Sequence, residues 1–249
     1  MLTSLSRRIW FGFSLLTAIL VISVPVAADD LDREQVIDLL AATGTGQVPD
    51  LTRKDLTGLD LSGVDFKGAD LFAADLSGAK LRGSNLSRAN LNRAVLTEAD
   101  LTEANLRAAN MFAVIMNGAD LTGADLSHAR IIGELRNTRL NEAKLIEADL
   151  GFDPTNQNMV PAIVDLSGAI LDGANLTGAN LTSASMQYAS LQDAVLQNAR
   201  LNWAKLAGTD FSGADLSGAD LSDADLTNAV LTGVSGADSA TGLGGDTAQ

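Results

Sequence analysis

An apolar residue recurs at every fifth position over most of the chain. One run extends from Leu51 to Ile131 and a second from Leu166 to Leu231, and most of these centres are leucine. Alanine usually stands two residues before a centre, Asp or Asn directly before it, and Ser or Thr directly after it. The consensus is therefore Ala-(Asp/Asn)-Leu-(Ser/Thr)-Xaa, in which Xaa is often Gly.

A period of five fits neither an α-helix nor a straight strand. On a helix, successive centres would be rotated by about 140° and would wander around the axis. On a strand, alternate centres would fall on opposite faces because five is an odd number. The pattern fits a chain that turns once per repeat, with Ala and Leu pointing inward and Asp, Asn, Ser and Gly in the bends. Such sides close into coils that stack about 4.8 Å apart through backbone hydrogen bonds.

This repeat resembles the pentapeptide repeat family over nearly all of residues 51–231. The resemblance implies an all-β fold, a right-handed quadrilateral β-helix solenoid with four repeats in each coil. Residues 20 apart in sequence would then lie above one another. The match is specific for the fold but says little about function.

The N-terminus has the pattern of an export signal. Two arginines precede a stretch from Ile9 to Ala28 that carries no charge and ends in small residues. This predicts a secretory signal peptide that is cleaved after Ala28. The alternative is an uncleaved anchor, because such a stretch is long enough to span a bilayer. Membrane contact is expected only through this segment, and only if it is uncleaved.

Other segments flank or interrupt the repeats. Residues 30–40 have the apolar stripe of a short helix, which would cover the first coil. The register slips after Ile131, so we expect a distorted coil at 132–139, and the Pro-containing stretch 151–161 predicts a protruding loop. The expected divisions are a signal peptide at 1–28, a capping helix and linker at 29–50, β-helix at 51–150, an interruption at 151–165, β-helix at 166–234 and a flexible tail at 235–249.

Composition excludes several kinds of chemistry. The chain has no Cys and one His, which excludes disulfides and thiolate sites and disfavours a His-based metal site or triad. With 31 acidic and 17 basic residues the net charge is −14, so direct nucleic-acid binding is not expected. No catalytic motif, phosphate loop or dinucleotide fingerprint is present. We therefore expect a non-enzymatic protein without a cofactor or a metal.

One corner of the predicted coils is apolar. Stacking at intervals of 20 aligns Phe72, Asn92, Phe112 and Ile132 in one outward column, and Val95 with Ile115 in the next. An exposed contiguous apolar patch usually marks an interaction site. The loop adds two further apolar residues, whereas Tyr188 and Trp203 occupy single outward positions in the second half. The candidate partner-binding surface is Phe72, Val95, Phe112, Ile115, Ile132, Phe152 and Met159.

The order of signal, short helix and β-helix resembles the lumenal and periplasmic branch of the family. This implies an exported protein-binding or structural scaffold in the thylakoid lumen or periplasm, with an unidentified protein partner. The alternative is a resemblance to the quinolone-resistance pentapeptide proteins, which implies an acidic, rod-shaped DNA mimic that binds and protects DNA gyrase or topoisomerase. The charge and the loop interruption favour this alternative, and the export signal opposes it. A poorly covered last coil, near Leu216 to Leu231, also predicts a homodimer through the C-terminal coil.

Overall fold

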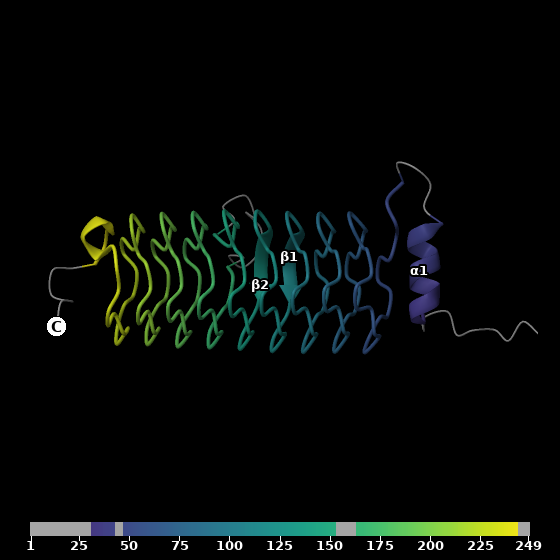
Figure 1. Cartoon of the computed structure of the whole chain (residues 1–249), viewed down its shortest axis with the longest axis horizontal. Helices are drawn as coiled ribbons and strands as arrows, with labels where there is room; N and C mark the ends of the chain where they lie inside the picture. Colours follow the sequence, from purple (N-terminus) through teal and green to yellow (C-terminus); the bar gives the residue numbers. More distant parts are fainter. Residues whose placement is uncertain (1–30, 43–46, 153–162, 244–249) are drawn as a thin grey trace, which may run out of the picture.

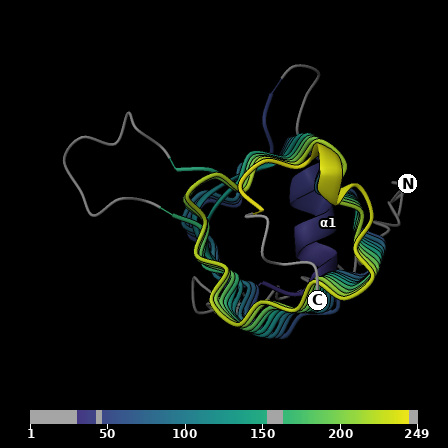
Figure 2. The same ribbon diagram turned by 90° about the vertical axis from the view of Figure 1, so that its left-hand side faces the viewer.

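The computed structural model describes residues 31–42, 47–152 and 163–243. The chain winds in four-sided coils along one axis and forms a rod (Figure 1, Figure 2). The prediction of a right-handed quadrilateral β-helix is confirmed. Within the described ranges, no helix has the length and apolar character needed to cross a membrane. The expected signal segment 1–28, most of the expected loop with Met159, and the end of the expected tail lie outside the described residues.

Each five-residue repeat forms one side of a coil and one tight turn. In the repeat centred on Leu101, the Ala104 N–H donates to the Leu101 carbonyl at 3.0 Å and closes the turn. The Leu101 N–H donates to the carbonyl of Asp120, one coil further on, at 2.7 Å. The Asp100 carboxylate accepts from the Thr102 N–H at 3.0 Å and from its hydroxyl at 2.7 Å. The Asp-Leu-Thr sequence therefore encodes the bend itself, as Asx turns do.

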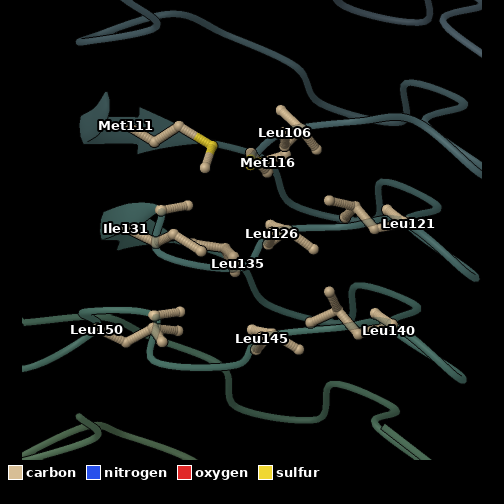
Figure 3. Packing of buried hydrophobic residues seen from close by; sticks show 14 of the residues in the cluster. Leu106, Met111, Met116, Leu121, Leu126, Ile131, Leu135, Leu140, Leu145 and Leu150 are labelled. Carbon is tan, nitrogen blue, oxygen red and sulfur yellow. The ribbon is translucent and has the colours of Figure 1, made fainter. Parts of the chain in front are cut away.

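The core is a set of stacked apolar columns inside the rod. Met111, Ile131 and Leu150 lie above one another on successive coils (Figure 3). The leucines and alanines that face inward are buried along almost the whole rod, and Phe66 and Phe211 are the largest of the fully buried side chains. Burying each leucine contributes about 1.5–3 kcal/mol, so stability is distributed along the coils.

Isolated parallel bridges join the coils into four ladders, one per side. One ladder begins with Asp50, Asp70 and Asn90 and ends at Thr241. Except at Thr241, each residue of this ladder is followed directly by an inward-facing centre. We number the described coils 1–9 by these centres. In order they are Leu51, Leu71, Leu91, Met111, Ile131, Leu150, Leu181, Leu201 and Leu221.

Two longer strands mark a one-residue deletion in the middle of the rod. Strand β1, Asn110–Ile115, pairs in parallel with β2, Arg130–Glu134. Phe112 pairs with Ile132, but Val114 pairs with Gly133, so Ala113 has no counterpart in β2. The expected distortion at 132–139 is therefore confined to one missing turn residue. Leu135 is already a normal buried centre, 1% exposed, which the repeat pattern alone did not reveal.

The ladders continue on both sides of the interruption at residues 153–162. The Phe152 N–H still donates to the Thr182 carbonyl at 3.1 Å, and Asp165 bridges to Glu134 on one side and Ser185 on the other. Glu134 and Asp165 are 31 positions apart instead of 20, so the interruption adds 11 residues to one coil. The segments on either side of it depart from a single corner of the rod (Figure 2).

The two ends of the rod differ. Helix α1, Arg33–Ala41, begins with a capping box between Asp32 and Gln35 and buries Val36 completely. It lies across the open end of the first coils, as predicted (Figure 1). At the other end the rod extends beyond the expected boundary at 234. Ser235 and Thr241 still bridge to the preceding coil, with the short 3-10 helix η1, Ala237–Ser239, between them. The prediction of a flexible tail from residue 235 is therefore wrong for residues 235–241, because their backbone groups complete two ladders.

The turn carboxylates predict acid sensitivity. Asp215 accepts from the Ser217 hydroxyl and from the Gln197 amide, both at 2.6 Å, and these hydrogen bonds lower its pKa from 3.8 to about 2. The pKa of Asp225 is lowered in the same way by Thr227. A depressed folded-state pKa gives stability that is present above pH 3.8 and is lost as the pH falls toward about 2. We expect the thermal midpoint to fall across that window. A midpoint that is unchanged across it would contradict the assignment, and Ser217→Ala should raise the pKa of Asp215.

The aromatic corner as a candidate protein-binding surface

Two residues at each corner face outward: the one after the centre and the turn residue that follows it, which we call the tip. At the corner that contains Phe152, no described tip is a glycine, although most of these tips have a positive φ. Its tips along the rod are Arg53, Ala73, Arg93, Ala113, none in coil 5, Phe152, Ser183, Trp203 and Asp223. The diagonally opposite corner has glycine at Gly63, Gly83, Gly123, Gly173, Gly213 and Gly233.

Keeping side chains at these tips costs free energy. Ala73, Arg93 and Trp203 have φ values of 54°, 60° and 58°, in the left-handed region that glycine occupies most easily. A residue with a Cβ is destabilised by roughly 1–2 kcal/mol there. The diagonal corner shows that the same fold accepts glycine at such positions. The side chains at this corner are therefore not explained by the stability of the coil.

Aromatic side chains recur at this corner in every second coil. Phe72 in coil 2 and Phe112 in coil 4 are half-buried, whereas Phe152 in coil 6 and Trp203 in coil 8 are 40% and 59% exposed. Two coils span about 9.6 Å, so the four rings follow one another at nearly even intervals. We call the corner that consists of these four residues and the tips named above the aromatic corner.

The structure brings together five of the predicted surface residues. Phe72, Phe112 and Phe152 lie on the corner, while Val95 and Ile115 stack beside it on the adjoining ladder. Ile115 is 36% exposed and adds to the apolar surface.

Ile132 is a correction. It belongs to the predicted column, but it is 1% exposed and cannot serve as a surface contact. The coil of Ile132 lacks the tip residue, so the chain turns tightly beside this side chain. Phe112 in the preceding coil and Gly151 in the following coil lie on either side of it.

Trp203 was missed at the sequence level. Counting in steps of 20 from Ile132 does not reach it, because the deleted tip and the 11 added residues shift every later position. When both offsets are included, Trp203 occupies the same position in its coil as Ala113 and Phe152. Trp203 is therefore on the same edge of the rod as the three phenylalanines.

The corner is also electrostatically distinct. Its charged tips are Arg53, Arg93 and Asp223, whereas those of the diagonal corner are all acidic: Glu103, Glu142 and Asp193. The Arg93 guanidinium lies 5.9 Å from the centre of the Phe72 ring, within the range of a cation–π contact. In a chain with a net charge of −14, this edge combines aromatic rings with both signs of charge.

The described residues offer less for catalysis or metal binding. They contain no group of three His, Cys, Asp or Glu side chains placed to hold a metal ion. One surface cavity of about 340 Å³ is lined by Arg82, Asp120 and Arg139 among others; Arg139 pairs with Asp120 at 2.7 Å inside it, and Arg82 pairs at 2.8 Å with Glu103, which lies outside the lining. His128 is exposed, 3.3 Å from the Glu147 carboxylate.

A comparison with protein-family models agrees with the fold. The family model for pentapeptide repeats matches in overlapping copies across residues 50–133 and 164–233. A comparison with curated proteins returned no match. HetL from the cyanobacterium Nostoc sp. strain PCC 7120, a pentapeptide repeat protein involved in heterocyst differentiation regulation, is 30% identical over 83% of this chain and 95% of its own, with a TM-score of 0.37.

Two other solved structures are more distant in sequence. QnrB1, a plasmid-mediated fluoroquinolone resistance protein, is 16% identical over 69% of this chain and 91% of its own, with a TM-score of 0.40. A pentapeptide repeat protein from the thylakoid lumen of Arabidopsis thaliana is 24% identical over 68% of each chain, with a TM-score of 0.16. With the repeat model covering more than half of its length, the chain belongs to the pentapeptide repeat family.

Proposed function

We propose that this protein is a non-enzymatic scaffold that binds protein through the aromatic corner. The observation that carries the proposal is the alignment of Phe72, Phe112, Phe152 and Trp203 along one edge of a rigid rod. Aromatic side chains dominate the energetics of protein interfaces, because they bury a large area and lose little conformational entropy.

The rod suits this task because it holds its surface fixed. Each coil is tied to the next by backbone hydrogen bonds on all four sides, and the core is packed throughout. A surface that is ordered before binding loses little entropy on association. Binding surfaces on a solenoid are also extended, because each surface position recurs in successive coils.

We further propose that the scaffold acts after export, in the periplasm or the thylakoid lumen. The support is the sequence of residues 1–28, in which two arginines are followed by a long uncharged stretch and then by small residues. Fractionation of the native source and intact mass of the purified protein test this. We expect a soluble exported species that starts at Asp29, and an unprocessed cytoplasmic species would contradict export.

The gyrase-protecting DNA mimic is supported by the net charge of −14 and by the interruption of the repeats at 151–165. The ladders argue against it, because basic residues interrupt them. One ladder contains Asp60, Lys80, Asp100, Asp120 and Arg139 in succession. Duplex DNA presents an unbroken series of phosphates. We therefore expect no protection of gyrase in a supercoiling assay, and protection would revive this alternative.

Partner capture tests the proposed surface. With immobilised mature protein and the exported fraction of its native source, we expect the double variant Phe152→Ala/Trp203→Ala to lose about nine-tenths or more of the captured partner, since these are the two most exposed aromatic side chains of the corner. Tyr188→Ala is the matched control, because Tyr188 is 77% exposed on a different corner and should leave capture unchanged. Equal capture by both variants would show that the aromatic corner is not the binding surface.

A further inference from the structure

One side of the rod carries a cluster of positive charge, although the chain as a whole is acidic. It is the side of the ladder that begins with Asp50, and it lies between the aromatic corner and the corner that carries Arg88 and Arg107. The chain crosses this side once in each coil, and three successive crossings are residues 87–93, 107–113 and 127–133. These crossings contain four arginines, one histidine and no acidic residue, whereas the whole chain has 31 acidic and 17 basic residues.

Three arginines of the first two crossings are exposed and can reach a ligand. They are Arg88, Arg93 and Arg107. Within the described part of the chain, Arg88 and Arg93 form no ion pair, and the Arg93 guanidinium lies against the Phe72 ring. The Arg107 guanidinium has five N–H donors, and one of its nitrogens donates to the Asp125 carboxylate at 3.3 Å. Most donors of the three guanidiniums therefore remain available to an acceptor from outside.

Two of these arginines occupy positions that glycine adopts more easily. Arg88 and Arg93 both have a φ of 60°, in the left-handed region. The corner of Arg88 has glycine at the same place in other coils, at Gly68, Gly178 and Gly218. The coil therefore does not require arginine at these tips, and their side chains call for another explanation.

The surroundings limit the size of the ligand. Between the two corners the ladder residues of the first two crossings are Asn90 and Asn110, which carry no charge. Acids bound the three crossings at both ends, with Asp70 in the crossing before them and Glu147 and Asp149 in the crossing after them. Three crossings span about 10 Å, the length of about three extended residues. A short ligand fits between the acids, whereas a plane of negative charge such as a membrane would also approach them and be repelled.

We propose that this side, which we call the basic side and define by Arg88, Arg93 and Arg107, binds a short acidic segment of the partner protein. A guanidinium matches a carboxylate closely, because it donates two parallel N–H bonds to the two oxygens. The proposal names the chemistry of the partner under Proposed function, and to that extent it rests on that function.

Arg93 connects the basic side to the aromatic corner. Its guanidinium lies 5.9 Å from the centre of the Phe72 ring, and Phe112 is at the corner end of the next crossing. A partner segment that carries acidic and apolar side chains would therefore contact both surfaces at once. These residues belong to coils 2–4, whereas residues 153–162, outside the described part of the chain, connect in coil 6.

A synthetic peptide tests the proposal before the partner is identified. The probe is fluorescein-labelled hexaglutamate, titrated with the purified mature protein and followed by fluorescence anisotropy at about 0.1 M salt, where the Debye length is about 10 Å. We expect saturable binding, and the double variant Arg88→Ala/Arg107→Ala should bind at least about tenfold more weakly, because two of the three guanidiniums are lost. An absence of binding to the wild type, or equal binding of wild type and variant, would overturn the proposal.

Arg200→Ala/Lys205→Ala is the matched control. It removes the same net charge at two exposed positions of coil 8, about 19 Å along the rod from the crossing of Arg107. Because this distance exceeds the Debye length, the affinity for hexaglutamate should change by less than about twofold. An equal loss of affinity in both double variants would show that the peptide senses only the overall charge, and would also overturn the proposal.

Lipid vesicles present the other anionic surface. With vesicles of equal parts phosphatidylcholine and phosphatidylglycerol, we expect the mature protein not to sediment. Sedimentation that Arg88→Ala/Arg107→Ala abolishes would overturn the proposal in favour of a membrane surface. None of these assays changes Phe152 or Trp203, so a failure of the basic side leaves partner capture by the aromatic corner separately testable.

Discussion

A Leu106→Asp variant is expected to lose about 4 kcal/mol or more of folding free energy. Leu106 is fully buried, and its N–H is bonded to the Asp125 carbonyl of the next coil, so the side chain cannot rotate out to solvent without breaking the ladder. The substitution removes a buried leucine and places an unpaired carboxylate among alkyl groups. Thermal or denaturant unfolding of the purified variant measures the loss.

The matched control for this variant is the residue beside it. Asn105→Asp introduces the same side chain at the outward position of the same repeat, where a carboxylate can still accept from the Arg107 N–H but lies beside the carboxylate of its ladder neighbour Asp125. We expect it to cost about 1 kcal/mol or less, well below the loss in Leu106→Asp. Hydrogen exchange in Leu106→Asp should rise first in the adjacent coils, because coils contact only their neighbours. Equal stability of the two variants would contradict the inward assignment of the centres.

A Gly133→Ala variant is expected to destabilise the rod strongly, because the added methyl group would clash with backbone atoms of the adjacent coil. Gly133 has a φ of 150°, and a Cβ there would overlap the Val114 carbonyl oxygen and lie 2.8 Å from the Val114 nitrogen. Both contacts are backbone, so neither can move aside without opening the β1–β2 pair. We expect a loss of about 3 kcal/mol or more, measured by denaturant unfolding.

The Gly63→Ala variant distinguishes the destabilisation caused by the clash from that caused by the backbone conformation. Gly63 has a φ of 69°, but a Cβ at this position would meet nothing within 4 Å. Its replacement should cost only about 1–2 kcal/mol, the ordinary penalty of the left-handed region. If Gly133→Ala and Gly63→Ala lost equal stability, the close approach at the shortened coil would not be the reason for a glycine there.

The fold was predictable because its determinants are local and repeated. The Asp-Leu-Thr sequence at 100–102 contains the turn acceptor, the core side chain and the turn donor of one side of a coil, and the same information recurs along the rod. The shortened coil was harder to place. Gly133 occupies the position that alanine usually fills, so the deletion is visible only when Leu135 is recognised as a centre.

The candidate site was predictable only in the first half of the rod. Phe72 and Phe112 precede the deletion, so a constant interval of 20 aligns them. Trp203 follows both the deletion and the insertion, and its column can be found only from the ladder pairings. The burial of Ile132 was beyond sequence reasoning as well, because most residues directly after a centre are partly covered or exposed, and only small ones such as Ser127 and Gly151 are otherwise buried there.

Hydroxyl-radical footprinting tests the central claim most directly, because it compares side chains of one molecule in two states. The protein is oxidised in its native extract and again as dilute purified chain, and oxidation of each aromatic residue is measured by mass spectrometry. If the aromatic corner is the interaction surface, oxidation of Phe152 and Trp203 will be several-fold lower in the extract, while that of Tyr188 on another corner will not change. Equal oxidation of Phe152 and Trp203 in both states would contradict the claim.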